Sequence, residues 1–127
     1  MLADMNFAEA DPGEGHFIQG YERGRILIDG RGYGESLILS PARVIPGWGP
    51  VSAADLREEY LVPLIALEPQ LVVIGTGERQ VFPNPRLWSS LWKRGVGVEI
   101  MSTGAACRTY NILMSDGRRV AAGLILG

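Results

Sequence analysis

The strongest constraint on this fold is a continuous apolar run, LVVI, at residues 71–74, which a Gly-Thr-Gly sequence follows directly. A strand with one face in water alternates apolar and polar residues, and this run does not alternate. Its β-branched residues are typical of a strand that is covered on both faces. The run therefore predicts a sheet with other structure packed against each side.

A helix is predicted after this run, starting at Asn84. The side chain of Asn84 can cap the first turn, and Pro85 occupies the first helical position, where its missing N–H costs nothing. Gly95 can adopt the left-handed conformation that ends a helix. The apolar residues that follow predict a strand over 96–101.

The last third of the chain repeats this order. Thr103 is predicted to cap a third helix that ends at Gly117, and a closing strand is expected over 120–126. A strand, helix, strand order places neighbouring strands parallel, with helices on the sheet. The predicted class is therefore α/β.

A further helix is predicted before the run. Ser52 and Asp55 have the spacing of a capping box, with an acid suited to the positive end of the helix. Pro63 lies inside the helical pattern and should interrupt it. We expect two short turns rather than one long helix.

Glycine-rich turns separate short strands in the first third of the chain, which predicts a β-meander. The expected strands are 17–21, 25–28 and 36–39, with a further extended piece at 43–45. No repeat or low-complexity segment is present. We expect one domain over residues 16–127, preceded by a flexible acidic lead over residues 1–15.

Composition and charge exclude several classes of function. The net charge of −2 comes with twelve scattered basic residues, which argues against a nucleic-acid partner. One cysteine and one histidine provide no zinc cluster, and no cofactor or metal is expected. No apolar run approaches the ~20 residues that span a bilayer. The acidic lead does not resemble a signal or transit sequence, so we expect a cytoplasmic protein.

The sequence GTGERQ at residues 75–80 resembles a dinucleotide-binding turn only in part. That fingerprint needs a third glycine where Gln80 stands, and a helix that starts directly from the turn. Residues 81–83 instead lead onward to Asn84. We interpret the two glycines as a sharp exit from a buried strand.

A candidate cleft follows from the parallel sheet, because ligands bind beyond the carboxyl ends of such strands. Two of these ends are Gly75, Thr76, Gly77, Glu78 and Arg79, and Ser102, Thr103 and Gly104. If their strands are neighbours, Arg79, Arg108 and the N–H groups at Thr103 and Gly104 could receive a carboxylate or another anion. The alternative is that Thr103 only caps its helix and the arginines are solvated.

Cys107 stands one turn into the third helix, where a helix dipole can activate a thiol. A lone cysteine in a packed helix is more often a small buried residue, and no histidine nearby in sequence could serve as its base. No arrangement for hydrolysis, phosphoryl transfer or metal chemistry is assembled. An enzymatic activity is therefore not expected, although the sequence does not decide the question.

The segments LVVIGTGERQVFPNP and GVGVEIMSTGAACRTYNILMSDGRRVAAGLIL, with the earlier ILIDGRGYGESLILSP and Trp48, resemble a known family. This is the Mth938-like family of domains of unknown function, which includes the mitochondrial NADH dehydrogenase (complex I) assembly factor 3 and the adipogenesis-associated Mth938-domain protein. The resemblance covers most of residues 16–126. It implies a single three-layer α/β domain, with a central mixed sheet, helices on one side and a small β-layer with a further helix on the other.

The resemblance also implies a function through protein contacts rather than catalysis. It carries the family's loop residues onto Gly75, Thr76, Gly77, Thr103, Gly104, Arg108 and Asn111 as a candidate surface. We expect an interaction or assembly factor with an unidentified protein partner. The alternative is a small-anion or metabolite-binding protein, or a weak enzyme, that uses the same cleft. The oligomeric state stays open.

Overall fold

A five-stranded sheet forms the centre of the molecule. The computed structural model describes residues 5–6 and 15–126. The strand order across the sheet is β6-β5-β9-β7-β8, in which β7 runs parallel to both neighbours and β5 runs antiparallel to β6 and β9. The strands are β5 (Leu37–Leu39), β6 (Val44–Pro46), β7 (Leu71–Gly75), β8 (Gly97–Met101) and β9 (Val120–Leu124).

Both faces of this sheet are buried, which is the physical reason for the continuous apolar run in β7. Val72 and Ile74 point into one hydrophobic core, and Val73 points into the other. Side chains alternate between faces along a strand, so this one strand contributes side chains to both cores. Burying each of these side chains stabilises the fold by about 1.5 to 3 kcal/mol.

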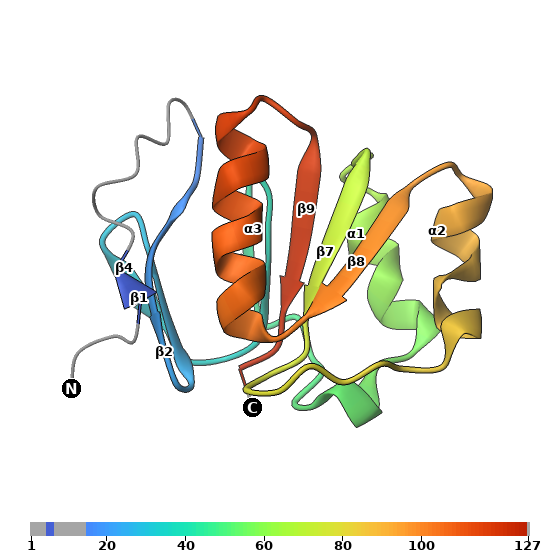
Figure 1. The fold of residues 1–127 in the computed structure, drawn as a ribbon, viewed down its shortest axis with the longest axis horizontal. Coiled ribbons are helices and arrows are strands. Elements are labelled where there is room, and N and C mark those ends of the chain that lie inside the picture. Colours follow the sequence, from blue (N-terminus) through green and yellow to red (C-terminus); the bar gives the residue numbers. More distant parts are fainter. Residues whose placement is uncertain (1–4, 7–14, 127) are drawn as a thin grey trace.

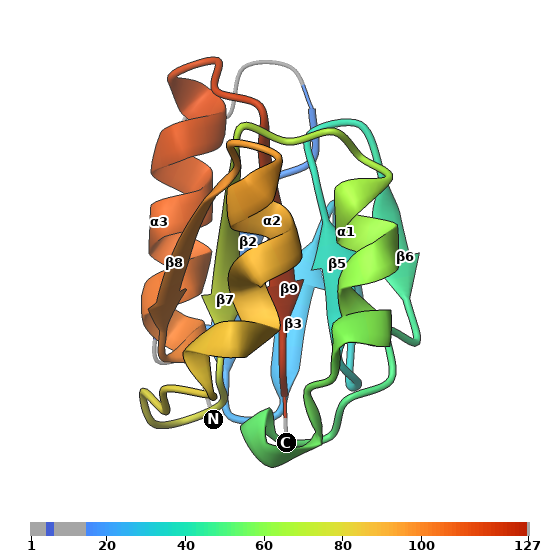
Figure 2. The same cartoon turned by 90° about the vertical axis from the view of Figure 1, so that its right-hand side faces the viewer.

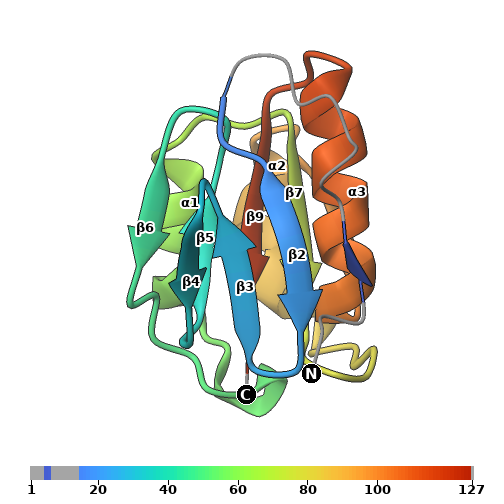
Figure 3. The ribbon, with the colours of Figure 1, turned by 90° about the vertical axis from the view of Figure 1, so that its left-hand side faces the viewer.

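Helices cover one face of the central sheet, as Figure 2 shows. They are the short helices α1 (Val62–Ile65) and α2 (Ser89–Lys93), together with the 3₁₀ segments η1 (Ala53–Asp55), η2 (Glu58–Leu61) and η3 (Pro85–Trp88). On the opposite face, α3 (Thr103–Ser115) lies beside a small sheet (Figures 1 and 3). The prediction of a three-layer α/β domain with a mixed central sheet is confirmed.

The small sheet is an antiparallel meander in the order β1-β2-β3-β4. Its strands are β1 (Met5–Asn6), β2 (Ile18–Glu22), β3 (Arg25–Ile28) and β4 (Arg31–Tyr33). Asp29 and Gly30 have positive φ angles of 52° and 80°, the conformation of a two-residue hairpin turn. β4 was not among the predicted strands, because Gly30 and Gly32 are typical of a turn.

The expected flexible lead over residues 1–15 falls mostly outside the described residues. Of these fifteen, the structure describes Met5, Asn6 and Gly15. Met5 and Asn6 pair with Tyr21 and Gly20 of β2. This pairing adds a short strand that the sequence pattern did not predict.

Two predicted helices are broken into shorter segments. From Ser52, η1, η2 and α1 follow one another, and Pro63 lies in the first turn of α1. The Asp55 carboxylate accepts from the Ser52 backbone N–H at 3.1 Å, as the capping-box spacing predicts. The helix expected from Asn84 begins as η3 and becomes α2, and Gly95 follows its end with a φ of 77°.

Candidate functional site

The two predicted loops lie side by side at the end of the central sheet where the parallel strands β7 and β8 finish. We call this end the carboxyl rim; it comprises residues 76–82 after β7 and residues 102–104 after β8. The two strands are parallel neighbours in register from Leu71 and Gly97 to Gly75 and Met101. Their exits therefore meet at the same end of the sheet, as the sequence reading required (Figure 1).

Backbone hydrogen bonds join the two loops directly. The Thr76 N–H donates to the Met101 carbonyl at 2.9 Å, and the Thr103 N–H donates to the Gly77 carbonyl at 2.8 Å. The Thr103 N–H, which the sequence reading offered to an anion, is therefore taken by the neighbouring loop. The two loops bind each other, and the part of the predicted cleft at Thr103 is closed.

Two threonine hydroxyls complete this connection. The Thr103 hydroxyl accepts from the Gly77 N–H at 2.8 Å and donates to the Ile125 carbonyl at 2.6 Å. The Thr76 hydroxyl accepts from the Val81 N–H at 3.0 Å and donates to the Arg79 carbonyl at 2.6 Å. These hydrogen bonds hold the loops in one conformation, because breaking one would leave a buried donor or acceptor without a hydrogen-bond partner.

Thr103 is not the cap of α3, which corrects the sequence reading. The N-cap is Ser102, whose hydroxyl accepts from the Ala105 N–H at 3.4 Å. Thr103 is the first residue inside the helix, and its side chain is fully buried. Both residues have the chemistry of a cap, and only the contacts made by distant segments distinguish them.

The glycines of the Gly-Thr-Gly sequence have structural roles. A Cβ on Gly75 would lie 2.8 Å from the Thr103 Cα, so glycine is needed for α3 to approach β7. Gly77 has a φ of 107°, a conformation that other residues rarely adopt. This geometry accounts for both glycines without a bound phosphate.

The exposed part of the carboxyl rim is the loop that continues from Glu78. Glu78 forms an ion pair with Arg23 of the turn between β2 and β3, whereas Arg79 is exposed. Phe82 follows with 70% of its surface exposed, a large fraction for an aromatic side chain. Arg108 of α3 is also exposed. The sequence reading missed Phe82, although an aromatic residue between a turn and Pro83, outside any apolar pattern, was the available signal.

A recess lies at Pro83, the residue that follows Phe82 in the chain. It has a volume of about 470 Å³. Its walls come from Ala53 and Leu56 near η1 and from Leu87 of η3. An exposed aromatic side chain near a recess with a mixed apolar and polar lining is typical of a surface that contacts another protein.

Asn111, the last predicted site residue, lies away from the two loops. Its amide accepts from the Ile18 N–H at 2.9 Å and donates to the Ile18 carbonyl at 2.8 Å. The neighbouring Tyr110 hydroxyl donates to the His16 carbonyl at 2.6 Å. Asn111 and Tyr110 therefore fasten α3 to the start of β2.

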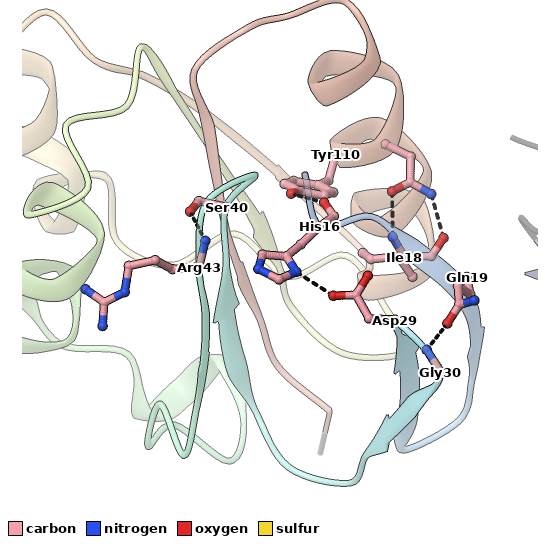
Figure 4. Close-up of polar contacts among 9 residues, drawn as sticks. His16, Ile18, Gln19, Asp29, Gly30, Ser40, Arg43 and Tyr110 are labelled. Atoms are coloured by element: carbon pink, nitrogen blue, oxygen red, sulfur yellow. Dashed lines mark hydrogen bonds and ion pairs between the residues drawn. The ribbon is translucent and has the colours of Figure 1, made fainter. Parts of the chain in front are cut away.

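Further polar contacts surround this junction, as Figure 4 shows. The His16 ring pairs with the Asp29 carboxylate, and the Gly30 N–H donates to the Gln19 side chain. These contacts attach the turn between β3 and β4 to the start of β2. The sole histidine of the chain thus contacts the small sheet and lies apart from the carboxyl rim.

Cys107 is fully buried in the core between α3 and the central sheet. Burial raises the pKa of its thiol far above the ordinary value of 9.0, and the nearby Arg108 lowers it only in part. A thiol in this state is protonated at neutral pH and is a poor nucleophile. The structure therefore supports the interpretation of Cys107 as a small core residue.

Two broader tests concern metals and membranes. Within residues 5–6 and 15–126, no group of three or more histidine, cysteine or carboxylate side chains is placed to hold a metal ion. In the same part of the chain, no helix is both long enough and apolar enough to cross a membrane.

The layers and the joined loops define a class, the Mth938-like α/β domains. The solution structure of a Mth938-like domain protein from Bordetella pertussis is 29% identical to this chain, with a TM-score of 0.80 over 91% of this chain and 89% of that one. The chain belongs to the family described as protein of unknown function (DUF498/DUF598), whose model matches residues 18–125. The resemblance read from the sequence motifs is confirmed.

Two similar proteins carry more specific names. One is the 13 kDa major membrane protein of Francisella tularensis, which is 30% identical over 86% of this chain and 89% of its own length. The other is NADH dehydrogenase (ubiquinone) 1 alpha subcomplex assembly factor 3 of Xenopus tropicalis, which is 33% identical over 92% of this chain. The match covers 64% of that assembly factor, so the chain spans less than two thirds of its length.

Proposed function

We propose that this protein is a non-catalytic assembly factor that contacts a subunit of respiratory NADH dehydrogenase, and that the carboxyl rim is its contact surface. The observation that carries the proposal is the 33% identity, over 92% of this chain, to a protein named as an assembly factor for that enzyme. Because the match leaves part of that relative uncovered, its function comes to this chain only as a proposal.

The geometry of the carboxyl rim supports a protein contact. Phe82 supplies exposed aromatic surface, and Arg79, three residues before it in the chain, supplies exposed positive charge. Arg108 is a further exposed arginine on α3. Aromatic and arginine side chains are enriched among the residues that dominate binding energy at interfaces. The hydrogen bonds of Thr76 and Thr103 hold the base of the loop, which lowers the entropy lost on binding.

Site-specific crosslinking provides a direct test. A photoreactive phenylalanine analogue, p-benzoylphenylalanine, replaces Phe82 in cells of the source organism, and mass spectrometry identifies the crosslinked proteins. The matched control places the same analogue at Val62 of α1, where 61% of the surface is exposed. We expect a subunit of NADH dehydrogenase to be captured from position 82 and not from position 62. Its absence at 82, or equal capture at both positions, would contradict the proposal.

A second measurement tests the assembly role itself. The double variant Phe82→Ala with Arg79→Glu should lower the amount of assembled NADH dehydrogenase on native gels, while the level of the variant protein stays normal. Val62→Ala with Arg94→Glu is the matched control, because both of its residues are exposed and lie on or beside the short helices α1 and α2. Equal amounts of assembled enzyme in the two double variants would argue against this surface.

An anion site at the carboxyl rim is the alternative function. The Thr103 N–H bonds to Gly77, so the groups left to receive a carboxylate are Arg79, Arg108 and the Gly104 N–H. Thermal-shift measurements with small carboxylates and nucleotides test it, since a ligand at 100 times its Kd adds about 2.7 kcal/mol to stability. An unchanged melting temperature across the series would remove this alternative.

The cytoplasm is the compartment that we propose. A single buried cysteine suits a reducing environment, whereas the Francisella tularensis relative is named a membrane protein. Fractionation of cells separates the two possibilities. Recovery of the protein with the membrane fraction after a high-salt wash would contradict a cytoplasmic location.

A further inference from the structure

A second recess lies at the opposite end of the central sheet, where the parallel strands β7 and β9 begin. We call this end the amino rim. Three chain connections form it: the turn between β5 and β6, the connection from α1 to β7, and the connection from α3 to β9. Figure 2 shows all three at the end of the molecule away from the C-terminus. The recess has a volume of about 340 Å³, within the range of small-molecule sites.

The walls of this recess are aliphatic. Met114 and Val120 are almost fully buried, and Pro69 is buried beside them. Pro41 and Leu67 complete the apolar lining. None of the lining residues is aromatic, so the recess suits a flexible hydrocarbon chain better than a planar ring.

The polar groups of the recess are cationic or neutral donors. Arg118 and Arg119 line it from the connection between α3 and β9. Their backbone N–H groups are used within the fold, since Arg118 donates to Leu113 at 3.0 Å and Arg119 donates to the Gln70 side chain at 3.2 Å. The Arg119 guanidinium donates through Nε to the Glu68 carbonyl at 3.4 Å, so the charged donors that this connection offers a ligand are its Nη groups and the Arg118 guanidinium.

Ser40 adds a third donor from the β5–β6 turn. Only 6% of its surface is exposed, and its hydroxyl oxygen accepts from the Arg43 N–H at 3.1 Å. No acceptor for the hydroxyl hydrogen is found among residues 5–6 and 15–126. A buried hydroxyl with an unused hydrogen can donate to a carboxylate oxygen in the recess.

The surrounding charges disfavour a ligand that carries more than one negative charge. Glu68 and Asp116 stand beside the lining residues, and the carboxyl end of α3 also carries partial negative charge. These negative charges balance the two arginines, so the recess has no net positive charge to hold a phosphate that carries two. A singly charged ligand would be held by direct hydrogen bonds to the guanidinium groups rather than by net charge. A carboxylate, which forms paired hydrogen bonds with a guanidinium, fits this balance.

We infer that the amino rim is a binding site for a small aliphatic carboxylate, whose head contacts Arg118, Arg119 and Ser40 and whose chain lies on Met114 and Val120. This site lies at the other end of the sheet from the proposed protein contact. It does not depend on that contact, and the two can be tested separately.

Octanoate is the probe for this inference. Titration into the ¹⁵N-labelled protein, followed by NMR, should shift the backbone amides of residues 40, 42, 43 and 117–120 in a saturable way. Acetate, which lacks the chain, and 1-octanol, which lacks the charge, should each bind at least tenfold more weakly. The double variant Arg118→Gln with Arg119→Gln should weaken octanoate at least tenfold, whereas Arg94→Gln should leave it unchanged.

A filling variant separates the recess from general surface attraction. Ala42 is exposed and lines the recess, so Ala42→Trp can occupy the volume while the protein stays folded. We expect this variant to lose octanoate binding and to keep an otherwise native NMR spectrum. The inference is overturned if octanoate does not bind, if 1-octanol binds as tightly, or if neither variant weakens it, because the arginines would then serve only the end of α3.

Discussion

The two rims of the central sheet differ in whether their chain connections form hydrogen bonds with one another. At the carboxyl rim, Thr76 and Thr103 join the loops after β7 and β8 with short hydrogen bonds, and the exposed surface lies farther along, at Phe82. At the amino rim, three connections meet around an open recess with Arg118 and Arg119 at its side. A rim whose polar groups bond one another suits a rigid contact surface, whereas a rim with cationic side chains beside an open recess suits an anionic ligand.

The largest expected effect concerns the close packing at the carboxyl rim. Gly75→Ala should destabilise the protein by about 3 kcal/mol, because the new Cβ meets the backbone of Thr103 at 2.8 Å. Gly34→Ala is the control, since a Cβ there meets nothing within 4 Å, and it should change stability by less than about 0.5 kcal/mol. Urea denaturation measures both. Equal stability of the two variants would mean that α3 can move away from β7 at little cost.

The next effect tests the hydrogen bonds between the loops. Thr103→Val should cost about 2 kcal/mol, because the Gly77 N–H and the Ile125 carbonyl lose their partner inside the protein. Thr103→Ser keeps the hydroxyl and should recover most of this loss. The comparison variant Thr109→Val removes a hydroxyl that contacts the Met101 sulfur, and should cost about 0.5 kcal/mol. A loss at Thr103 no larger than at Thr109 would argue that the rim is not held by these bonds.

A smaller, pH-dependent effect concerns α3, the helix that runs from one rim to the other. The folded protein raises the pKa of Cys107 above 9.0 and that of Tyr110 above 10.0, mainly through burial. The unfolded chain releases these protons at lower pH than the folded protein does. Stability is therefore complete below about pH 9 and falls as the pH rises, by about 1.4 kcal/mol per pH unit for each group.

Denaturation at pH 8 and pH 10 measures this loss. Cys107→Ala should remove the part of the slope that begins near pH 9, whatever its effect at pH 8, because alanine does not titrate. Tyr110→Phe serves as the second variant; a third measurement at pH 11 should show that it removes only the part of the slope above about pH 10. A wild-type stability that does not change between pH 8 and pH 10 would show that the thiol reaches solvent.

The smallest expected effect distinguishes a role of Phe82 in binding a partner from a role in stabilising the fold. Phe82→Ala should change the free energy of unfolding by less than about 0.5 kcal/mol, because most of the ring lies in solvent. The same variant should still weaken partner capture. A loss of more than about 1 kcal/mol would assign Phe82 to the packing of the loop and remove it from the proposed contact surface.

The sequence was sufficient for features that depend on local pattern. The continuous run at 71–74 predicted a strand buried on both faces, and the strand and helix order predicted that β7 and β8 would end at one edge. The Pro63 interruption and the Asp55 contact to Ser52 also followed from local rules. Each of these depends on residues close together in the chain.

Features that depend on distant residues were missed. Thr103 reads as a helix cap, and only its contacts with Gly77 and Ile125 show that it fastens two loops to β9. Asn111 was assigned to the candidate surface through family resemblance, yet its amide contacts Ile18, ninety-three residues away in sequence. No periodicity or spacing encodes such a pairing, because it arises from the way α3 lies beside the small sheet.

The pairing between Asn111 and Ile18 has a consequence for the behaviour of the protein at high concentration. A strand that begins with an unsatisfied N–H and C=O offers a template on which a strand of another molecule can add. The side-chain amide of Asn111 presents the same donor and acceptor as a peptide group, so it occupies that template from within. One helical residue thus protects the start of β2 against intermolecular aggregation.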